Sequence, residues 1–265
     1  MIPNLLKRGL ANRRISLLVY AAGLAAYSVF IVAIWSSFKN TQIQQLWNSY
    51  PESLKKAFGA TINLGTFDGF FTLEFLNQMW PLVLSVFSIG FATAALAGEV
   101  EKGTMEVLLA QPVKRRIIVT TRHLLYLLTL LGLIVATLVP VMAGAPIVGG
   151  EISYQGLAAL SLQALLFFAA IGSYSFFFAA VFSSRSRAIF ISVGVLIFAY
   201  ALNILSKLND FINHFNFLSL FNYYDPYRYL HDVSFAWGDL AVLAGVSAFS
   251  VAAAVLWFDR RDIAC

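Results

Sequence analysis

Charged residues are scarce in this chain: only 12% of its 265 residues are Asp, Glu, Lys or Arg, whereas 60% are hydrophobic. Soluble domains carry about 25% charged and about 45–50% apolar residues, so this chain has too few charges to cover a water-soluble surface. The mean hydropathy of +0.77 agrees. The composition argues against a water-soluble enzyme, a disordered protein or a nucleic-acid partner, and it indicates an integral membrane protein.

Cysteine is nearly absent too, and histidine is rare. The one cysteine, Cys265, is the last residue of the sequence, so no internal disulfide and no prenylation motif are expected. The histidines, His123, His214 and His231, lie far apart, and we interpret each as a hydrogen-bonding residue rather than a metal ligand. We therefore expect no catalytic residues, no metal site and no cofactor in this chain.

The sequence contains several long runs of apolar residues without any charged residue. A helix needs roughly 20 mostly apolar residues to cross about 30 Å of hydrocarbon. The first run is too long for the hydrophobic region of a cleaved signal peptide, so we expect it to remain as a membrane span. The runs predict an all-α integral membrane protein with six transmembrane helices, near residues 16–37, 80–98, 123–146, 157–181, 188–206 and 240–258.

Lysine and arginine are unevenly divided between the segments that connect these spans. If the N-terminus is cytoplasmic, 13 of the 18 bases fall in cytoplasmic segments and 5 fall outside. Cytoplasmic loops of membrane proteins carry an excess of these residues. We therefore expect a multi-pass protein of the inner, cytoplasmic cell membrane with both termini in the cytoplasm.

Three further segments have predicted roles. Residues 2–14 are expected to form an amphipathic helix on the inner leaflet, with a solvated basic tail as the alternative. Residues 39–74 form an outer segment with a surface helix among aromatic residues, or a ligand-binding lid. Residues 207–239 contain an uncharged run too short to span, which predicts a re-entrant or interfacial segment on the outer side. The bases of the first segment are Lys7, Arg8, Arg13 and Arg14.

The predicted spans are themselves unusual in their polar content. They contain no Asp, Glu, Lys or Arg, which argues against a proton- or ion-coupled transporter. Their main buried amides are Gln163 and Asn203, for which helix–helix hydrogen bonds are the favoured role and substrate contact the second. Small residues at four-residue steps predict a face for helix or dimer packing, formed by Gly90, Ala94 and Gly98.

The segment 99–116 stands out because it places acids where the topology predicts bases. Gly103 permits a break after the second span, and Thr104 is suited to cap a helix over residues 105–111 with Glu106 in its first turn. Pro112 follows the end of that helix. The pattern is typical of a docking element for a soluble partner. It is not a phosphate-binding loop, because Thr104 replaces the essential lysine.

The run Gly98-Glu-x-Glu-x-Gly103-Thr104-x-Glu106-x-Leu-Leu-Ala-x-Pro112-Val-x-Arg resembles the cytoplasmic signature of the ABC type-2 permease family. The resemblance implies that two copies pair as a homodimer and that each docks a separate ABC ATPase, which holds the ATP and Mg. It also implies that residues 2–14 form a connecting helix beside the docking loop. The implied ATPase-coupling residues are Glu99, Glu101, Gly103, Thr104, Glu106, Leu109 and Pro112.

These observations together predict the membrane-spanning permease subunit of an ATP-driven exporter. The uncharged, aromatic-rich interior favours a hydrophobic or amphipathic substrate moved by alternating access. One alternative is an ABC complex that transmits force or senses a ligand and moves no solute. A non-ABC membrane scaffold and an intramembrane enzyme are weaker alternatives, because neither explains the acidic loop.

Overall fold

The computed structural model describes residues 2–38, 49–51, 55, 62–105 and 114–261, and of residues 2–12 it describes the backbone alone. Every long regular element in this part of the chain is a helix. The predicted all-α, six-span architecture is therefore confirmed. The helices that are long and apolar enough to cross a membrane are Arg13–Phe38, Phe67–Ala95, Arg115–Val148, Tyr154–Val181, Arg185–Leu208 and Trp237–Arg260.

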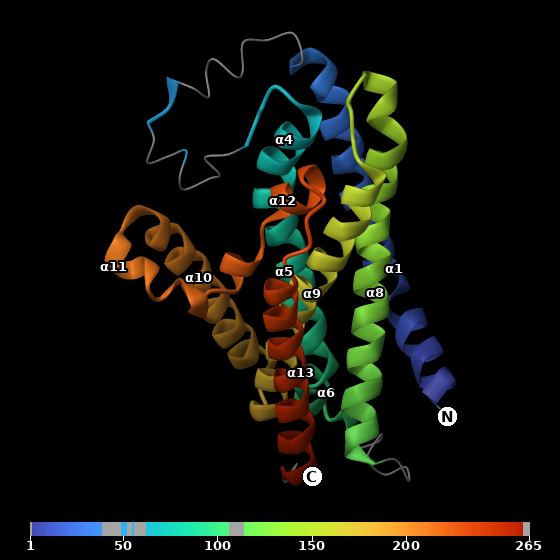
Figure 1. Cartoon of the computed structure of the whole chain (residues 1–265). Helices are drawn as coiled ribbons and strands as arrows, with labels where there is room; N and C mark the ends of the chain where they lie inside the picture. The colour runs from blue at the N-terminus through green and yellow to red at the C-terminus, as the bar shows by residue number, and fades with distance from the viewer. Residues whose placement is uncertain (1, 39–48, 52–54, 56–61, 106–113, 262–265) are drawn as a thin grey trace.

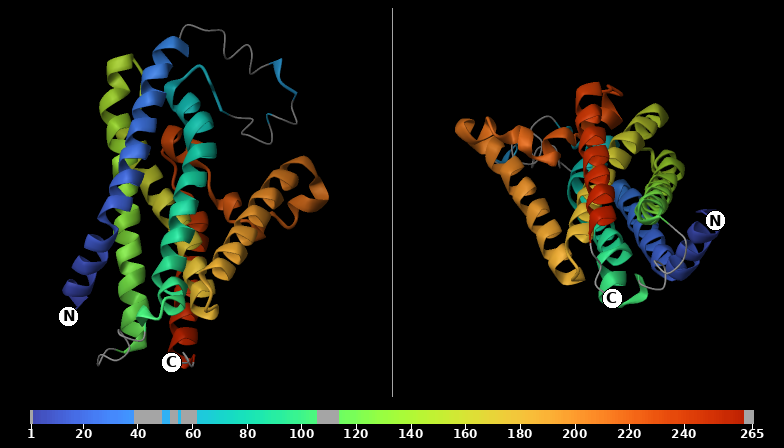
Figure 2. Two further views of the ribbon diagram at one scale, coloured as in Figure 1. Left: turned by 180° about the vertical axis from the view of Figure 1, so that it is seen from behind. Right: turned by 90° about the horizontal axis from the view of Figure 1, so that it is seen from below.

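The long helices form one elongated bundle, in which both described ends of the chain lie at the same end (Figure 1). We call this the termini end and the other the opposite end. α1 and α8 lie side by side, whereas α10 tilts away from the rest of the bundle (Figure 2). The long helices are α1 (Ile2–Phe38), α5 (Trp80–Ala95), α8 (Arg115–Gly144), α9 (Tyr154–Val181), α10 (Arg185–Leu208) and α13 (Trp237–Arg260).

α9 is the central helix, and it packs against α5, α8, α10 and α13. Close approach is possible because α9 presents small residues to its neighbours. A Cβ atom at Gly172 would lie 2.3 Å from Cζ of Tyr126, so the tyrosine ring occupies the space that the glycine leaves. The Tyr126 hydroxyl donates to the Phe168 carbonyl at 2.5 Å and lies 2.9 Å from Oγ of Ser88. One buried side chain thus ties α5, α8 and α9 together.

The second span differs from the prediction at both of its ends. It starts with α4 (Phe67–Phe71) and the π-helix η1 (Thr72–Met79), which continue directly into α5, whereas the prediction began the span at residue 80. Rings at four-residue steps lie on top of one another, with centroids 5.9 Å apart for Phe67 and Phe71. These stacked aromatic side chains stabilise helical structure in a stretch that was expected to be an outer connection.

α1 also differs from the expected arrangement. The predicted amphipathic helix of residues 2–14 and the span of residues 16–37 form one continuous helix of 37 residues. Its far half packs on α4 and η1 through aromatic pairs: the ring centroids are 5.8 Å apart for Trp35 and Phe67, and 5.3 Å apart for Tyr27 and Phe75. The opposite end of the bundle is therefore held together largely by aromatic rings.

The predicted re-entrant segment is a series of short helices that return from the tip of α10 to the bundle. Tyr224 anchors it: its ring stacks on Phe167 at 4.3 Å, and its hydroxyl donates to the Leu76 carbonyl at 3.0 Å. None of these elements is long enough to span. They are α11 (Asp210–Asn213), η3 (Asn216–Leu218), η4 (Leu220–Tyr223) and α12 (Pro226–His231). A separate short helix, η2 (Pro146–Val148), follows α8.

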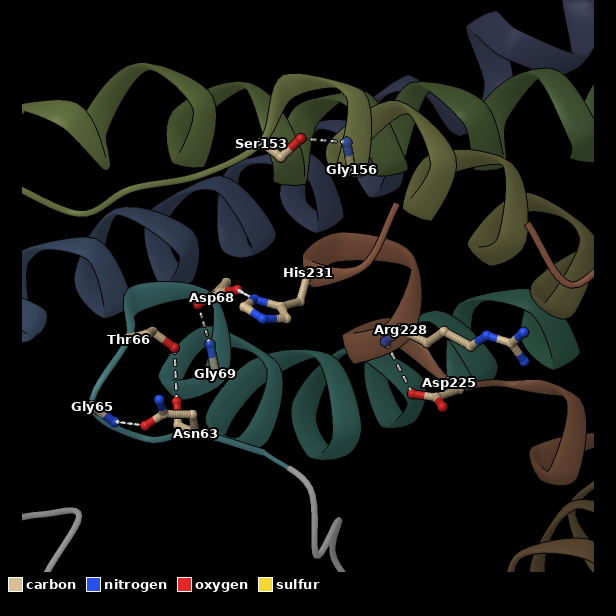
Figure 3. Close-up of polar contacts among 10 residues, drawn as sticks. All are labelled: Asn63, Gly65, Thr66, Asp68, Gly69, Ser153, Gly156, Asp225, Arg228 and His231. Carbon is tan, nitrogen blue, oxygen red and sulfur yellow. Dashed lines mark hydrogen bonds and ion pairs between the residues drawn. The ribbon is translucent and has the colours of Figure 1, made fainter. Parts of the chain in front are cut away.

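A carboxylate–imidazole pair joins α4 to α12 near the opposite end (Figure 3). Asp68 pairs with His231, and its other oxygen accepts a hydrogen bond from the Gly69 N–H at 3.0 Å. The side chain of Asp68 is 12% exposed and that of His231 is 46% exposed. α12 itself begins with a cap, because the Asp225 carboxylate accepts from the N–H of Arg228 at 3.3 Å.

Candidate functional site

The acidic loop lies at the termini end, directly after the second span. α5 ends at Ala95, and α6 (Ala97–Glu101) starts after a change of direction at Leu96. Gly103 then has a φ of 71°, in the left-handed region that favours glycine, and its N–H donates to the Val100 carbonyl at 3.1 Å. This tight turn closes the end of α6.

Glu99 of α6 forms an ion pair with Arg122 of α8. The same guanidinium donates to the Ala95 carbonyl at the end of α5, where the helix dipole favours a cation. Both side chains are partly buried, with exposed fractions of 31% for Glu99 and 18% for Arg122. Since partial burial reduces screening by solvent, this pair holds α5, α6 and α8 at a fixed separation.

Glu101 connects α6 to α10. Its carboxylate accepts a hydrogen bond of 2.6 Å from the backbone N–H of Arg185, the first residue of α10. A carboxylate at a helix N-terminus is stabilised by the helix dipole. The side chain of Arg185 also covers Gly98, because a Cβ atom there would lie 3.3 Å from Cδ of Arg185. α6 is thus attached to α10 by both polar and packing contacts.

α1 reaches the same region through Arg13. Its guanidinium lies 4.3 Å from the centroid of the Phe91 ring in α5, which is a cation–π contact. It is also close enough to interact electrostatically with Arg122, Glu99 and Arg185. Arg14, the next predicted residue, is exposed. Of the other two, Lys7 and Arg8, the structure describes only the helical backbone.

A second group of contacts joins α8, α9 and α13 at the same end. Arg116 pairs with Asp259 at 2.8 Å, and Arg115 donates to the carbonyl of Arg261. Arg261 in turn donates to the Ala180 carbonyl at 2.7 Å and to the hydroxyl of Ser183. Desolvation by burial lowers the pKa of the Arg261 guanidinium, which nevertheless stays charged at neutral pH.

All six long helices are therefore linked at the termini end by charged side chains. We call this set of contacts the termini-end network, and α6 is its hub, because its two acids contact α8 and α10. Such a network places α6 in direct contact with two of the spans. Its members are Arg13, Phe91, Ala95, Glu99, Glu101, Arg116, Arg122, Ala180, Arg185, Asp259 and Arg261.

The remaining predicted loop residues divide into two groups. The Thr104 hydroxyl donates to the carbonyl of Glu99 at 3.2 Å, so it closes the turn after α6. Met105, the first residue of the predicted docking helix, is fully buried in the core of this chain. Three predicted coupling residues lie outside the described residues: Glu106, Leu109 and Pro112.

The predicted small-residue face is not one surface. Gly98 lies in α6 beyond the break at Leu96, whereas Gly90 and Ala94 lie in α5. A Cβ atom at Gly90 would meet nothing within 4 Å in this chain. Of these two glycines, Gly98 is the one that a neighbouring side chain approaches closely, and the expected packing role of Gly90 and Ala94 stays a prediction.

Sequence reasoning missed the basic partners in this network. From the sequence, Arg122, Arg185 and Arg116 were used only to predict the membrane topology. Their acidic partners could not be assigned, because they are 23, 84 and 143 residues away in sequence. One signal was available. Each of these bases lies at or near the end of a predicted span that faces the same side as Glu99, and unpaired acids there need nearby cations.

The histidines all take part in hydrogen bonds. Nε2 of His123 lies 2.9 Å from Oγ of Ser173, and Nδ1 of His214 lies 2.9 Å from the Asp210 carbonyl oxygen. Among the residues that the structure describes, no group of three or more His, Cys, Asp or Glu side chains is arranged to hold a metal ion.

A comparison with protein families matches nearly the whole chain. The family model described as "ABC-2 family transporter protein" covers residues 9–263, which include all six candidate spans and the termini-end network. No curated protein matches the chain significantly. The family match therefore extends over the bundle and the loop together and is not limited to the short acidic signature.

Proposed function

Since the chain belongs to the ABC-2 family of transporter proteins, it is a permease subunit of an ABC transporter, and we propose that it works as an exporter driven by a separate ATPase. The family implies association with an ATP-binding partner. In this proposal two permease copies form a homodimer, each docks one ATPase subunit on residues 99–116, and ATP hydrolysis takes place in the partner.

The observation that carries the proposal is the position of α6 as the hub of the termini-end network. A partner that moves the loop displaces Glu99 and Glu101, and these two carboxylates contact α8 and α10. Through the network, a soluble ATPase that binds the loop can move the spans. Alternating access requires that the spans pack in two different ways. In this proposal, nucleotide binding to the partner shifts the equilibrium between the two packings.

Orientation follows from charge in the same proposal. Bases concentrate at the termini end, among them Arg115, Arg116, Arg122, Arg185 and Arg187. The positive-inside rule then directs this end, with both termini, to the cytoplasm of a cell membrane. The docking loop is thereby exposed to a cytoplasmic ATPase. The apolar and aromatic spans suit a hydrophobic or amphipathic substrate.

Two glycines supply a matched test of coupling. Gly103 and Gly149 have nearly the same conformation, with φ of 71° and 68°, and each donates its N–H to a carbonyl three residues before it at 3.1 Å. Replacing either by alanine imposes a similar strain of about 1 kcal/mol. We expect Gly103→Ala to reduce ATPase stimulation and transport severalfold, and Gly149→Ala to leave both unchanged.

The experiment is co-expression with the cognate ATPase, extraction in detergent, and measurement of complex mass by light scattering and of ATP hydrolysis. A mass of two permeases with two ATPases, and hydrolysis sensitive to Gly103→Ala alone, supports the proposal. If the chain purifies without an ATPase under every nucleotide condition, the docking role is wrong. If coupling is intact but no solute moves in proteoliposomes, the complex is mechanical or ligand-sensing.

A further inference from the structure

The surface between α1 and the second span has two cavities, one nearer the opposite end and one nearer the middle of the bundle. The first is a cavity of about 400 Å³ between α1 and the α4–η1 segment. The second is a cavity of about 310 Å³ between α1 and the η1–α5 segment. Tyr27 lines both cavities, and each has the size of a small-molecule site. We call the two cavities together the α1–η1 groove and refer to them as its first and second part.

The first part of the groove combines aromatic rings with a carboxylate. Glu74 is its only Asp, Glu, Lys or Arg among the described lining residues. Faces of aromatic rings attract cations, and a carboxylate adds a full negative charge beside them. The rings that line this part are Tyr27, Phe30, Phe38, Tyr50 and Phe70.

Glu74 differs from the other acid of its span because no cation among the described residues lies beside it. Asp68 is paired with His231, whereas no described Lys, Arg or His lies within ion-pair distance of Glu74, whose side chain is exposed. Both lie within the candidate span Phe67–Ala95. An acid in such a segment is costly without a partner and marks a site where a ligand supplies one.

The second part of the groove suits an apolar tail. It is lined by apolar and aromatic side chains and contains no charged residue among those described. Gly23 contributes to its width, because a Cβ atom there would meet nothing within 4 Å. The π-helix η1 forms the wall in both parts and carries Glu74, and π-helical turns occur frequently at functional sites.

We propose that the α1–η1 groove binds a lipophilic cation, such as a long-chain amine or quaternary ammonium compound. Its positive head pairs with Glu74 among the rings of the first part, and its alkyl tail lies in the second part beside Gly23. That this cation is the transported substrate rests on the proposed function, whereas its binding to the groove does not. The Glu74 carboxylate would repel the head of an anionic amphiphile. A neutral amphiphile would leave this carboxylate without a cation.

The test is equilibrium binding of radiolabelled dodecyltrimethylammonium to the full chain in nanodiscs of phosphatidylcholine, without ATPase or nucleotide. Dodecyldimethylphosphine oxide, which has the same tail and no net charge, is the comparison ligand. We expect saturable binding of the cation, with a Kd about tenfold higher for Glu74→Gln. Glu151→Gln, which removes an exposed acid outside the groove, should bind as the unaltered chain does.

A second pair of variants tests the binding of the alkyl tail in the second part of the groove and changes no charged residue. Gly23→Leu fills the second part of the groove and should abolish saturable binding, whereas Gly132→Leu, at another helical glycine with open space, should not. Elution as a single symmetric peak in detergent verifies the fold of each variant. Equal affinity for the uncharged ligand, or unchanged affinity in Glu74→Gln, would overturn the assignment. Such a failure leaves ATPase docking at the other end unaffected, so the two proposals fail separately.

Discussion

The two ends of the bundle are held together by different chemistry. At the termini end, Glu99, Glu101 and Asp259 connect helices through ion pairs and a charge-assisted hydrogen bond. At the opposite end, α1 and the second span meet through stacked rings such as Trp35 and Phe67, and one carboxylate–imidazole pair joins α4 to α12. Charged contacts between helices are thus concentrated at the termini end, where we propose that the ATPase docks.

The difference matters because the two kinds of contact respond differently to displacement. An ion pair between partly buried groups loses much of its energy when one partner is removed or turned. Aromatic rings contribute mainly through the burial of apolar area, and the hydrophobic effect is non-directional. We infer that the termini end moves as a connected unit, whereas the aromatic end adapts its shape.

The largest expected effect is on packing at the opposite end. A Cβ atom at Gly156 would lie 2.2 Å from the backbone oxygen of Leu230, which cannot move without displacing α12. Gly156→Ala should therefore lower the stability of the bundle by about 3 kcal/mol. The midpoint of thermal unfolding in detergent measures it, and a midpoint within a degree of the unaltered chain would contradict the described contact between α9 and α12.

Next in size is charge reversal in the hub. Glu99→Lys places a cation beside Arg122 and Arg13, so we expect a loss of about 2 kcal/mol, less than for a fully buried pair because both partners are partly exposed. ATPase stimulation should fall with it. The double variant Glu99→Arg with Arg122→Glu should recover most of the lost midpoint and coupling. Equal defects in the single and double variants would show that the pair itself is unimportant.

A smaller effect is expected at the carboxylate–imidazole pair of the opposite end. The side chain of His231 is 46% exposed, so solvent screens its contact with Asp68. His231→Gln should cost about 1 kcal/mol or less and leave ATPase stimulation unchanged. If this variant uncouples the ATPase as strongly as Glu99→Lys does, the functional distinction between the two ends is wrong.

The smallest effect is expected at Gly98. A Cβ atom there would meet Cδ of Arg185 at 3.3 Å, and the long arginine side chain can give way. Gly98→Ala should shift the unfolding midpoint by less than Gly156→Ala does, and it should change stability by about 0.5 kcal/mol or less. A large loss of stability in this variant would mean that Arg185 is held rigidly by the network.

Much of the fold could be predicted from the sequence, because long uncharged runs alternate with connecting segments that contain Lys and Arg. The helical stretch of residues 67–79 could not, since Asp68 and Glu74 interrupt its apolar character and its stability depends on stacking with α1. The continuity of α1 was missed for a related reason. Arg13 and Arg14 suggested a membrane boundary, yet Arg13 is accommodated by the ring of Phe91.

The candidate site was only half predictable. The spacing of Glu99, Glu101 and Gly103 identified the loop, because acids and a turn residue are conspicuous among basic connections. Their partners could not be assigned, since Arg122 and Arg185 approach α6 only when α8 and α10 are packed. The burial of Met105 within its own chain was likewise not predictable from the local pattern of the loop.

The central claim, that the α6 region is where the ATPase docks, is tested most directly by site-specific crosslinking. Cys265→Ser removes the sole cysteine, after which Lys102→Cys, exposed beside α6, or Glu151→Cys, exposed near the opposite end, receives a benzophenone maleimide. In membranes containing the cognate ATPase, irradiation should produce a permease–ATPase adduct from position 102 and none from position 151. An adduct from position 151, or its absence from position 102 in an active complex, would contradict the account.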